Sequence, residues 1–217
     1  MRHGFHEQLN DLQQSIIRMG QLTADAITGA VQSLAGQDVY LARQVIAADD
    51  EIDHLLIQIE LASFKLLALQ QPMARDLRFI GTGVKLVTDL ERMADHATDI
   101  ARITLKMAGE PLFRPLVDIP RMAELAQAMT REALIAYVEQ DVPRAHAMIA
   151  RDDEIDHLYK RIFDELMEIM QNNPDLVKQA THLLFVAMYL ERIGDHATNL
   201  GEWTIYMVTG ELAELNK

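Results

Sequence analysis

Apolar residues recur at intervals of three, four or seven along most of the chain, with polar residues between them. This spacing places the apolar side chains on one face of an α-helix. The chain has only ten glycines and six prolines, and good helix formers such as Ala, Leu, Glu and Gln are common. The pattern therefore predicts long amphipathic helices and no β-sheet.

Helix-ending residues divide this pattern into six helices. Asp38 can cap the start of the second helix, Pro72 ends it, and Pro174 separates the last two. The stretch from Gly109 to Pro120 is the only extended one rich in helix breakers, and we take it as a linker. The predicted helices span residues 5–35, 38–71, 73–108, 121–139, 143–170 and 175–208.

Two sequence motifs occur twice, about 100 residues apart. The motif Asp-Asp-Glu-Ile-Asp-His-Leu stands at residues 49–55 and, unchanged, at residues 152–158. A second motif at residues 90–98 matches residues 190–198 at seven of nine positions. The shared order and spacing indicate an internal duplication. The sequence thus predicts an all-α fold of two tandem three-helix bundles, residues 1–110 and residues 111–217.

Charge and composition narrow the classes of function. The chain has 33 acidic and 20 basic residues, a net charge of −13, which would repel the phosphates of nucleic acids. It has no cysteine, which excludes disulfides and thiolate metal sites. No apolar run is long enough to span a bilayer, and the N-terminus lacks the apolar core of a signal peptide. We therefore expect a cytoplasmic protein, peripheral to a membrane at most, with no nucleic-acid partner.

The repeated motifs place carboxylates beside the apolar helix faces. On a helical wheel Glu91 and Asp95 lie within about 40° of each other, next to the apolar stripe. Asp53 lies 19 residues before Pro72 and Glu91 lies 19 residues after it, so an antiparallel helix pair brings both to the same height. The candidate residues are Asp49, Asp53, Glu91, Asp95 and Asp99 in the first repeat, and Asp152, Asp156, Glu191, Asp195 and Glu202 in the second.

These acidic clusters allow two interpretations. Carboxylates gathered beside apolar surface repel one another, and a divalent or iron-type metal ion would relieve the repulsion. Alternatively, arginines such as Arg92 or Arg102 could neutralise the acids. Arg92 lies about 100° around the helix from Glu91, so we expect it not to reach the centre of the cluster. We favour a metal site in each repeat. We expect His96 and His196 to serve packing, or to contact the ligands of such a site, rather than to bind the metal directly.

The duplicated Glu-Arg-x-x-Asp-His-Ala-Thr motif, the Asp-Asp-Glu-Ile-Asp motif and the six-helix layout resemble the PhoU family of phosphate-uptake regulators over essentially the whole chain. The resemblance implies two tandem three-helix bundles in a cytoplasmic protein that is usually a homodimer. It also implies a regulator that helps a phosphate ABC transporter and a sensor histidine kinase report phosphate sufficiency, which damps the phosphate-starvation response.

Some members of this family carry polynuclear iron or other metal clusters on paired acidic motifs. By resemblance these motifs correspond to Asp49 and Asp53 with Glu91 and Asp95, and to their counterparts in the second repeat. The residue of the second repeat that corresponds to Asp99 is Asn199, so the two sites differ chemically.

A di-iron carboxylate oxidoreductase of the ferritin type is the alternative function. Glu51-x-x-His54 and Glu154-x-x-His157 have the Glu-x-x-His spacing that such enzymes use. On the helical wheel, however, both motifs point away from the apolar stripe, and each repeat has one motif where that design needs two. The sequence also lacks a Gly-rich phosphate loop or hydrolase motif, so we expect a regulatory adaptor rather than an enzyme or a purely structural scaffold.

Overall fold

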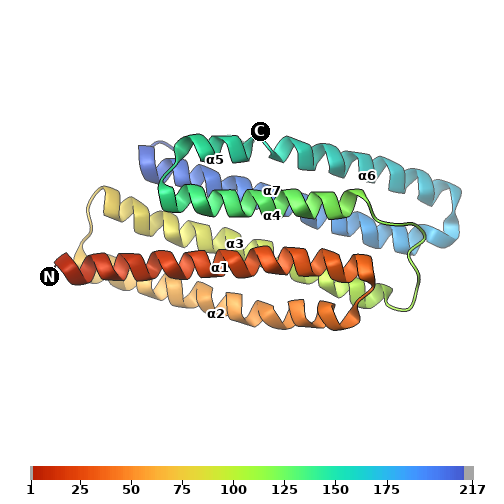
Figure 1. The fold of residues 1–217 in the computed structure, drawn as a ribbon, viewed down its shortest axis with the longest axis horizontal. Helices are drawn as coiled ribbons and strands as arrows, with labels where there is room; N and C mark the ends of the chain where they lie inside the picture. Colours follow the sequence, from red (N-terminus) through yellow and green to blue (C-terminus); the bar gives the residue numbers. More distant parts are fainter. Residues whose placement is uncertain (1, 213–217) are drawn as a thin grey trace.

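A computed structural model describes residues 2–212, with side chains described from residue 4, and this part of the chain contains helices and no strand (Figure 1). The first repeat comprises α1 (Arg2–Gly36), α2 (Val39–Gln70) and α3 (Arg75–Met107). The second comprises α4 (Asp118–Glu139), α5 (Val142–Ile149), α6 (Asp152–Asn172), the short 3₁₀-helix η1 (Pro174–Leu176) and α7 (Val177–Thr209). The predicted all-α class is confirmed. No helix within residues 2–212 is long and apolar enough to cross a membrane.

The helix boundaries follow local capping chemistry. The Asp38 carboxylate accepts hydrogen bonds from the backbone N–H groups of Tyr40 and Leu41, at 2.9 and 3.0 Å, and so caps α2 as predicted. The predicted linker was too long at its far end, because α4 already begins at Asp118. Pro120 therefore lies in the first turn of a helix, where the N–H that proline lacks would have no partner in any case.

The helix predicted over residues 143–170 is in fact two helices, so that prediction was wrong. The chain tightens at Ala150 and Arg151, where the Arg151 N–H donates to the Met148 carbonyl at 3.0 Å in a 3₁₀-type bond. No glycine or proline marks this break. Two close contacts with α7 hold the segments on either side of it. A Cβ atom on Gly201 would lie 2.6 Å from Met148 Cε, and one on Gly194 would lie 2.6 Å from Asp152 Oδ1.

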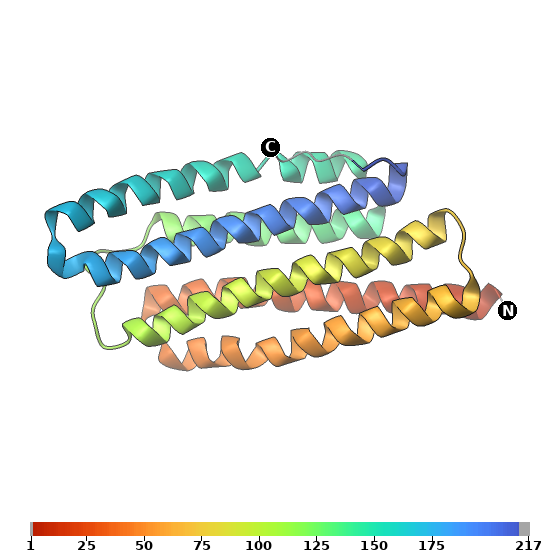
Figure 2. The same ribbon diagram turned by 180° about the vertical axis from the view of Figure 1, so that it is seen from behind.

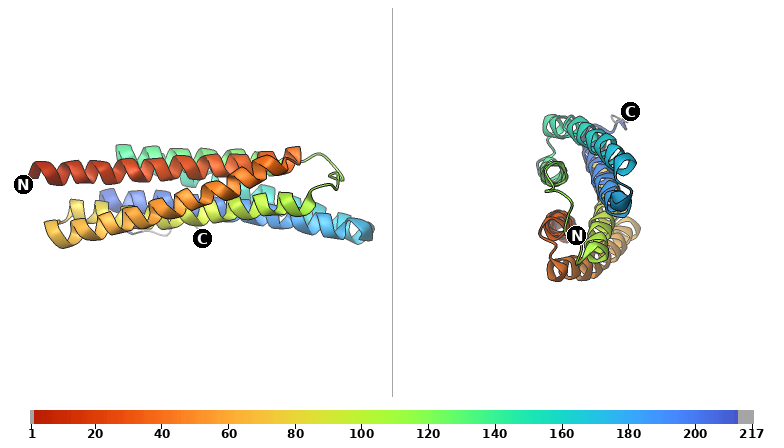
Figure 3. Two further views of the ribbon diagram at one scale, coloured as in Figure 1. Left: turned by 90° about the horizontal axis from the view of Figure 1, so that it is seen from below. Right: turned by 90° about the vertical axis from the view of Figure 1, so that its right-hand side faces the viewer.

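The two repeats meet through two antiparallel helix pairs. In Figure 2, α3 and α7 lie side by side at the centre, with α2 on one side and α6 on the other. In the end view of Figure 3, α1 and α4 lie together on one side of this central pair. Arg78 Nε donates to the Met207 carbonyl at 3.2 Å, and the Thr82 hydroxyl donates to the Trp203 carbonyl at 3.4 Å. An advance of four residues along α3 thus matches a retreat of four along α7.

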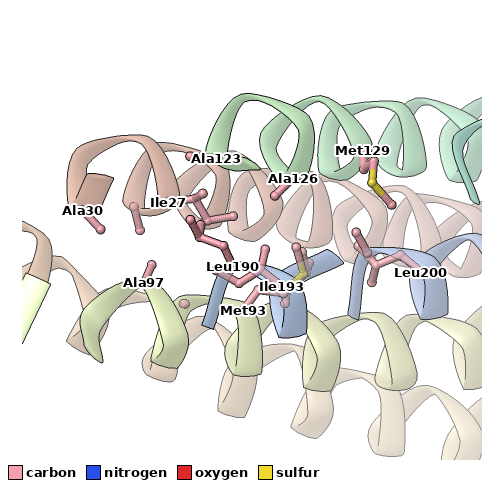
Figure 4. Packing of buried hydrophobic residues seen from close by; sticks show 14 of the residues in the cluster. Ile27, Ala30, Met93, Ala97, Ala123, Ala126, Met129, Leu190, Ile193 and Leu200 are labelled. Atoms are coloured by element: carbon pink, nitrogen blue, oxygen red, sulfur yellow. The ribbon is translucent and has the colours of Figure 1, made fainter. Parts of the chain in front are cut away.

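A single hydrophobic core runs through both repeats. Figure 4 shows its centre, where fully buried side chains from α1, α3, α4 and α7 converge: Ile27, Ala30, Met93, Ala97, Ala126, Met129, Leu190, Ile193 and Leu200. Burial of this apolar surface joins the two repeats. The boundary predicted between the two bundles, at residues 110 and 111, falls in the connection between α3 and α4. That these bundles are separate domains stays a prediction.

The connection between the repeats is fixed to the second repeat by a buried amide. The Gln179 side chain accepts a hydrogen bond from the Phe113 N–H at 2.8 Å and donates one to the Pro111 carbonyl at 3.1 Å. Gln179 is only 7% exposed, and both bonds are partly buried. These bonds give partners to two backbone groups of the connection and so fix its path along α7.

Replacing Tyr137 by phenylalanine is expected to raise the free energy of unfolding by about 1 kcal/mol. The Tyr137 ring stacks on Phe79 with centroids 5.6 Å apart, and the residue is fully buried. Within the described residues its hydroxyl has no hydrogen-bond partner, so folding strips water from this group without replacing it. Urea unfolding measures the effect. Tyr189→Phe is the control, because its hydroxyl bonds to Asp99 and its loss should destabilise the protein. A destabilised Tyr137→Phe variant would contradict the prediction.

Candidate functional site

Helices α2 and α3 bring four carboxylates of the first repeat close enough for their charges to interact: Asp49, Asp53, Glu91 and Asp95. Burial, followed by the charges of Asp53 and Asp95, raises the pKa of Asp49. Burial, followed by the charge of Asp95, raises the pKa of Glu91, to which Asp53 and Asp49 also contribute. Burial likewise raises the pKa of Asp95, with Asp53 contributing. Each of these groups is therefore held in its charged form at a cost in free energy at neutral pH.

Arg92 reaches this cluster, contrary to the expectation from the helical wheel. Its Nε lies 3.6 Å from Glu91 Oε2, and its Nη1 lies 3.6 Å from Asp95 Oδ2. A long arginine side chain can cross the roughly 100° of arc that separates successive residues of a helix. The charge of Arg92 lowers the pKa of both acids, yet the pKa of each remains raised. One arginine thus offsets only part of the negative charge of the cluster.

The second repeat builds a related cluster between α6 and α7, in which one carboxylate is more deeply buried. Asp152 is only 3% exposed, whereas Asp156 and Asp195 are exposed. Burial, then the charge of Asp195, then that of Asp156, raises the pKa of Glu191. Burial, followed by the charge of Asp156, raises the pKa of Asp195. The same electrostatic arrangement has therefore formed twice.

A glycine accounts for the deeper position of the Asp152 carboxylate. Gly194 stands where the first repeat has Ala94, and a Cβ at residue 194 would lie 2.6 Å from Asp152 Oδ1. The methyl group of an alanine would therefore occupy the space beside this carboxylate. The counterpart of Asp152 in the first repeat, Asp49, is only half-buried. The two clusters differ for a steric reason as well as through Asp99 and Asn199.

The two outlying candidates lie beside the clusters rather than within them. Asp99 forms an ion pair with Arg102, at 2.8 Å between Oδ1 and Nη1, and its charge contributes to the raised pKa of Asp95. Glu202 lies seven residues past Asp195 on α7, which is about 10 Å along the helix axis. Asp99 therefore borders the first cluster, while Glu202 is separated from the second by two helical turns.

Within the side chains that the structure describes, no three His, Asp or Glu groups converge closely enough to hold a metal ion in this conformation. The donor set nevertheless suits a hard cation, because carboxylate oxygens are the ligands that such ions take. Asp49, Asp53, Glu91 and Asp95 could hold an ion in the first repeat after side-chain rotation. Asp152, Asp156, Glu191 and Asp195 are the corresponding donors in the second repeat.

The two Glu-x-x-His motifs of the ferritin-like alternative are engaged elsewhere. Arg18 of α1 forms an ion pair with Glu51 at 2.5 Å, and Arg121 of α4 forms one with Glu154 at 3.0 Å. The Nδ1 atoms of His54 and His157 contact carbonyl groups of their own helices, those of Asp50 and Asp153. Both glutamates thus face the first helix of their repeat. This arrangement does not support a di-iron site at these motifs.

The histidines of the duplicated motif lie between the repeats, at the contact of α3 with α7. The His96 ring stacks on Tyr189 with centroids 5.4 Å apart and lies 5.8 Å from the ring of His196. His196 Nδ1 lies 2.9 Å from Asp89 Oδ1, which also accepts a hydrogen bond from Asn199 Nδ2 at 3.1 Å. Burial, followed by the charge of His196, lowers the pKa of His96 to about 4. His96 is thus neutral at physiological pH.

Sequence reasoning missed Asp89 and Tyr189 as partners of these histidines. They stand at equivalent positions, each directly before the duplicated motif, but their side chains differ. The signal in the sequence is this difference between the two copies, directly beside residues that are identical in both.

Comparison with known proteins agrees with these features. The family model of the PhoU domain matches the chain twice, at residues 16–104 and 119–204. A protein of Clostridium acetobutylicum named phosphate-specific transport system accessory protein PhoU homolog is 43% identical, over 98% of this chain and 97% of its own length. The homolog of the same name from Aquifex aeolicus is 40% identical, over 96% of this chain and 94% of its own.

Solved structures give the same result. The crystal structure of PhoU from Pseudomonas aeruginosa is similar with a TM-score of 0.92 and 33% identity, covering 95% of this chain and all of that one. That of the phosphate transport system regulatory protein PhoU from Streptococcus pneumoniae has a TM-score of 0.91 and 31% identity, covering 97% of this chain and all of that one. With two matched domains and full-length relatives, the chain belongs to the PhoU family.

Proposed function

We propose that this protein is a regulatory accessory protein of phosphate transport that acts without catalysis. The observation that carries this proposal is the similarity over nearly the whole chain to relatives named as accessory proteins of a phosphate-specific transport system. The protein would work in the cytoplasm as a homodimer, as an adaptor between a phosphate ABC transporter and a sensor histidine kinase. Its readout would be contact with these two partners.

The described side chains support an adaptor more than an enzyme. The duplicated motif at residues 90–98 and 190–198 places its histidines in contact between α3 and α7, where they join the two repeats. The Glu-x-x-His motifs are held in ion pairs with arginines of α1 and α4. Rigid antiparallel helices with solvent-facing sides suit the presentation of binding surfaces.

We further propose that each repeat holds a divalent or iron-type metal ion on its carboxylate cluster. The support is the chemistry of the donors and the raised pKa values of Asp49, Glu91 and Asp95 and of Glu191 and Asp195. A bound cation would supply positive charge that ties the two helices of each cluster together and stabilises the folded state. Asp99 would border the first of these sites, and Glu202 would lie two helical turns away from the second.

Deletion of the gene tests the regulatory role. A strain without this protein is expected to express its phosphate-starvation genes even when phosphate is plentiful, because the signal of sufficiency no longer reaches the kinase. Transcript levels in high and low phosphate measure the effect, and a plasmid copy of the gene is the control. A normal response in the deletion strain, with no second family member in the genome, would exclude the role.

A further inference from the structure

Helices α1 and α4 lie side by side on one face of the molecule, and an apolar groove opens between them (Figures 1 and 3). The two helices approach closely at Gly20, where a Cβ atom would clash with the side chain of Leu134. Beside this contact the groove has a volume of about 360 Å³. Its lining includes Ile17 together with Ile135 and Val138, which are 38% and 41% exposed. Exposed apolar side chains that share a groove are a candidate contact surface.

The internal duplication does not account for this groove. Residues 37–39 and 140–142 share the sequence Gln-Asp-Val, so α1 and α4 correspond with an offset of 103 residues. With this offset, Gln32 and Ala35 of α1 stand where α4 has Ile135 and Val138. The fold thus accepts a polar and a small side chain at the equivalent places. The apolar pair on α4 therefore points to a contact that is specific to this end of the face.

The groove is poor in charge within an acidic protein. From residue 8 to residue 24, α1 has only two charged side chains, and both are directed toward α2. Asp11 lines a separate groove between α1 and α2, and Arg18 pairs with Glu51 of α2. On α4, Glu132 is paired with an arginine of α5 at 2.7 Å. Two copies of a chain with a net charge of −13 repel each other, so a charge-poor face is where they can meet at the least cost.

Two opposite charges stand symmetrically about the apolar positions. Arg131 and Glu139 both line the groove, and each lies four residues from Ile135, about 6 Å along α4. Both are exposed. Arg131 has no ion pair among the side chains that the structure describes. Glu139 lies 3.6 Å from Arg144, which is closer to another glutamate, so both groove charges are open to a partner.

We propose that a second copy of this chain docks on this groove, with the two α4 helices antiparallel and a two-fold axis at Ile135. A two-fold contact brings residue i of one copy to residue j of the other, and j to i. With the axis at Ile135, Arg131 of each copy meets Glu139 of the other. A parallel contact would instead set each charge against its own copy. The groove is thus complementary to itself in the antiparallel arrangement alone. The proposal deepens the proposed function and rests on it for the expectation of a homodimer.

Size-exclusion chromatography with light scattering tests this contact on the full-length protein. The unmodified protein should be a dimer. Arg131→Glu sets two negative charges against each other at both ends of the contact, and Glu139→Arg does the same with two positive charges. Each variant should raise the dissociation constant of the dimer at least about tenfold, because like charges opposed across an interface are costly. Both positions are exposed, so both variants should fold, which circular dichroism checks.

An equimolar mixture of the two variants is the decisive measurement. In a mixed dimer the negative positions of one copy face the positive positions of the other, so dimers should return with a dissociation constant within about threefold of that of the unmodified protein. Mixing would not repair a dimer lost through local misfolding. Lys160→Glu is the matched control, because it makes the same charge change at an exposed position of α6 that does not line the groove. This variant should remain dimeric.

The outcomes separate this interface from the rest of the proposed function. If the unmodified protein is a dimer and Arg131→Glu remains one, or if mixing restores no dimers, the inference is wrong while the expected homodimer stands. A monomeric unmodified protein would overturn both the interface and the homodimer. The regulatory role is tested by deletion of the gene and could fail without any effect on these measurements.

Discussion

The Glu91→Gln/Asp95→Asn variant is expected to bind no metal in the first repeat and to bind metal normally in the second. When the variant and the unmodified protein are both metal-free, the variant should melt at the higher temperature. The loss of uptake follows from the removal of two carboxylate donors of one cluster. The gain in stability follows from their raised pKa values. An amide of the same shape removes a repulsion that the carboxylates maintain at neutral pH.

The pH dependence of this effect has a definite sign. A carboxyl whose pKa is higher in the folded protein stabilises the fold below its unfolded-state pKa, near 4.5 for Glu91 and 3.8 for Asp95, and this stabilisation is lost as the pH rises through the folded-state value. The difference in melting temperature should therefore vanish below about pH 4 and grow toward neutral pH. Because both groups are partly exposed and screened by solvent, we expect only about 1–3 °C.

Elemental analysis after incubation with iron, manganese or zinc measures the uptake. Glu191→Gln/Asp195→Asn is the mirror variant and should lose only the second site. Asp50→Asn/Asp153→Asn removes two exposed acids outside the clusters and should leave the metal content unchanged. If the unmodified protein binds no more metal than the Glu91→Gln/Asp95→Asn variant, the clusters are networks of ion pairs with Arg92 and Arg102, and the proposed metal sites do not exist.

Gly194→Val is expected to destabilise the protein by about 1–3 kcal/mol. A Cβ at this position would lie 2.6 Å from Asp152 Oδ1 and 3.1 Å from Ile155 Cδ1. Ile155 is fully buried and Asp152 is 3% exposed, so neither side chain has free space to move into. The start of α6 would have to shift away from α7. Chemical denaturation measures the loss, and metal uptake by the second repeat should fall with it.

The matched control is Gly81→Val on α3. Nothing lies within 4 Å of a Cβ at Gly81, which is exposed in the middle of a helix. This variant should stay within about 0.5 kcal/mol of the unmodified protein, because valine and glycine have similar helix propensities. If both variants lose the same stability, the loss comes from the helix backbone and the contact with Asp152 has no special part in it.

The fold could be predicted well because its determinants are local. Apolar spacing, the Asp38 cap and Pro72 act within a few residues of themselves, and apart from the helix predicted over residues 143–170 the predicted helices are observed. The break at Ala150 and Arg151 could not be predicted in this way. It depends on close approach to Gly194 and Gly201, which lie on another helix some 40–50 residues later. Long-range packing of this kind leaves no periodic signal in the sequence.

The acidic clusters were partly predictable. Asp53 and Glu91 lie equally far from Pro72 along the chain, which places them at the same height in the antiparallel pair. The charge of Asp53 contributes to the raised pKa of Asp49 and of Glu91, which agrees with that proximity. The position of Arg92 was predicted wrongly, because a helical wheel records where a side chain starts and not where a flexible one ends. Whether the carboxylates take a metal ion depends on rotamers and on solution chemistry that neither pattern nor spacing encodes.

The antiparallel contact of α3 with α7 sets each copy of the duplicated motif against the other. A molecule of one repeat would leave that apolar face open and would have to cover it with an identical chain, residue for identical residue. In a chain with two covalently joined repeats this requirement does not arise. Asp89 now bonds His196 and Asn199, while Tyr189, its counterpart, stacks on His96. Two identical faces would make each contact twice, once in each direction, whereas here each contact occurs once. Each repeat is therefore complementary to the other repeat and no longer to a copy of itself.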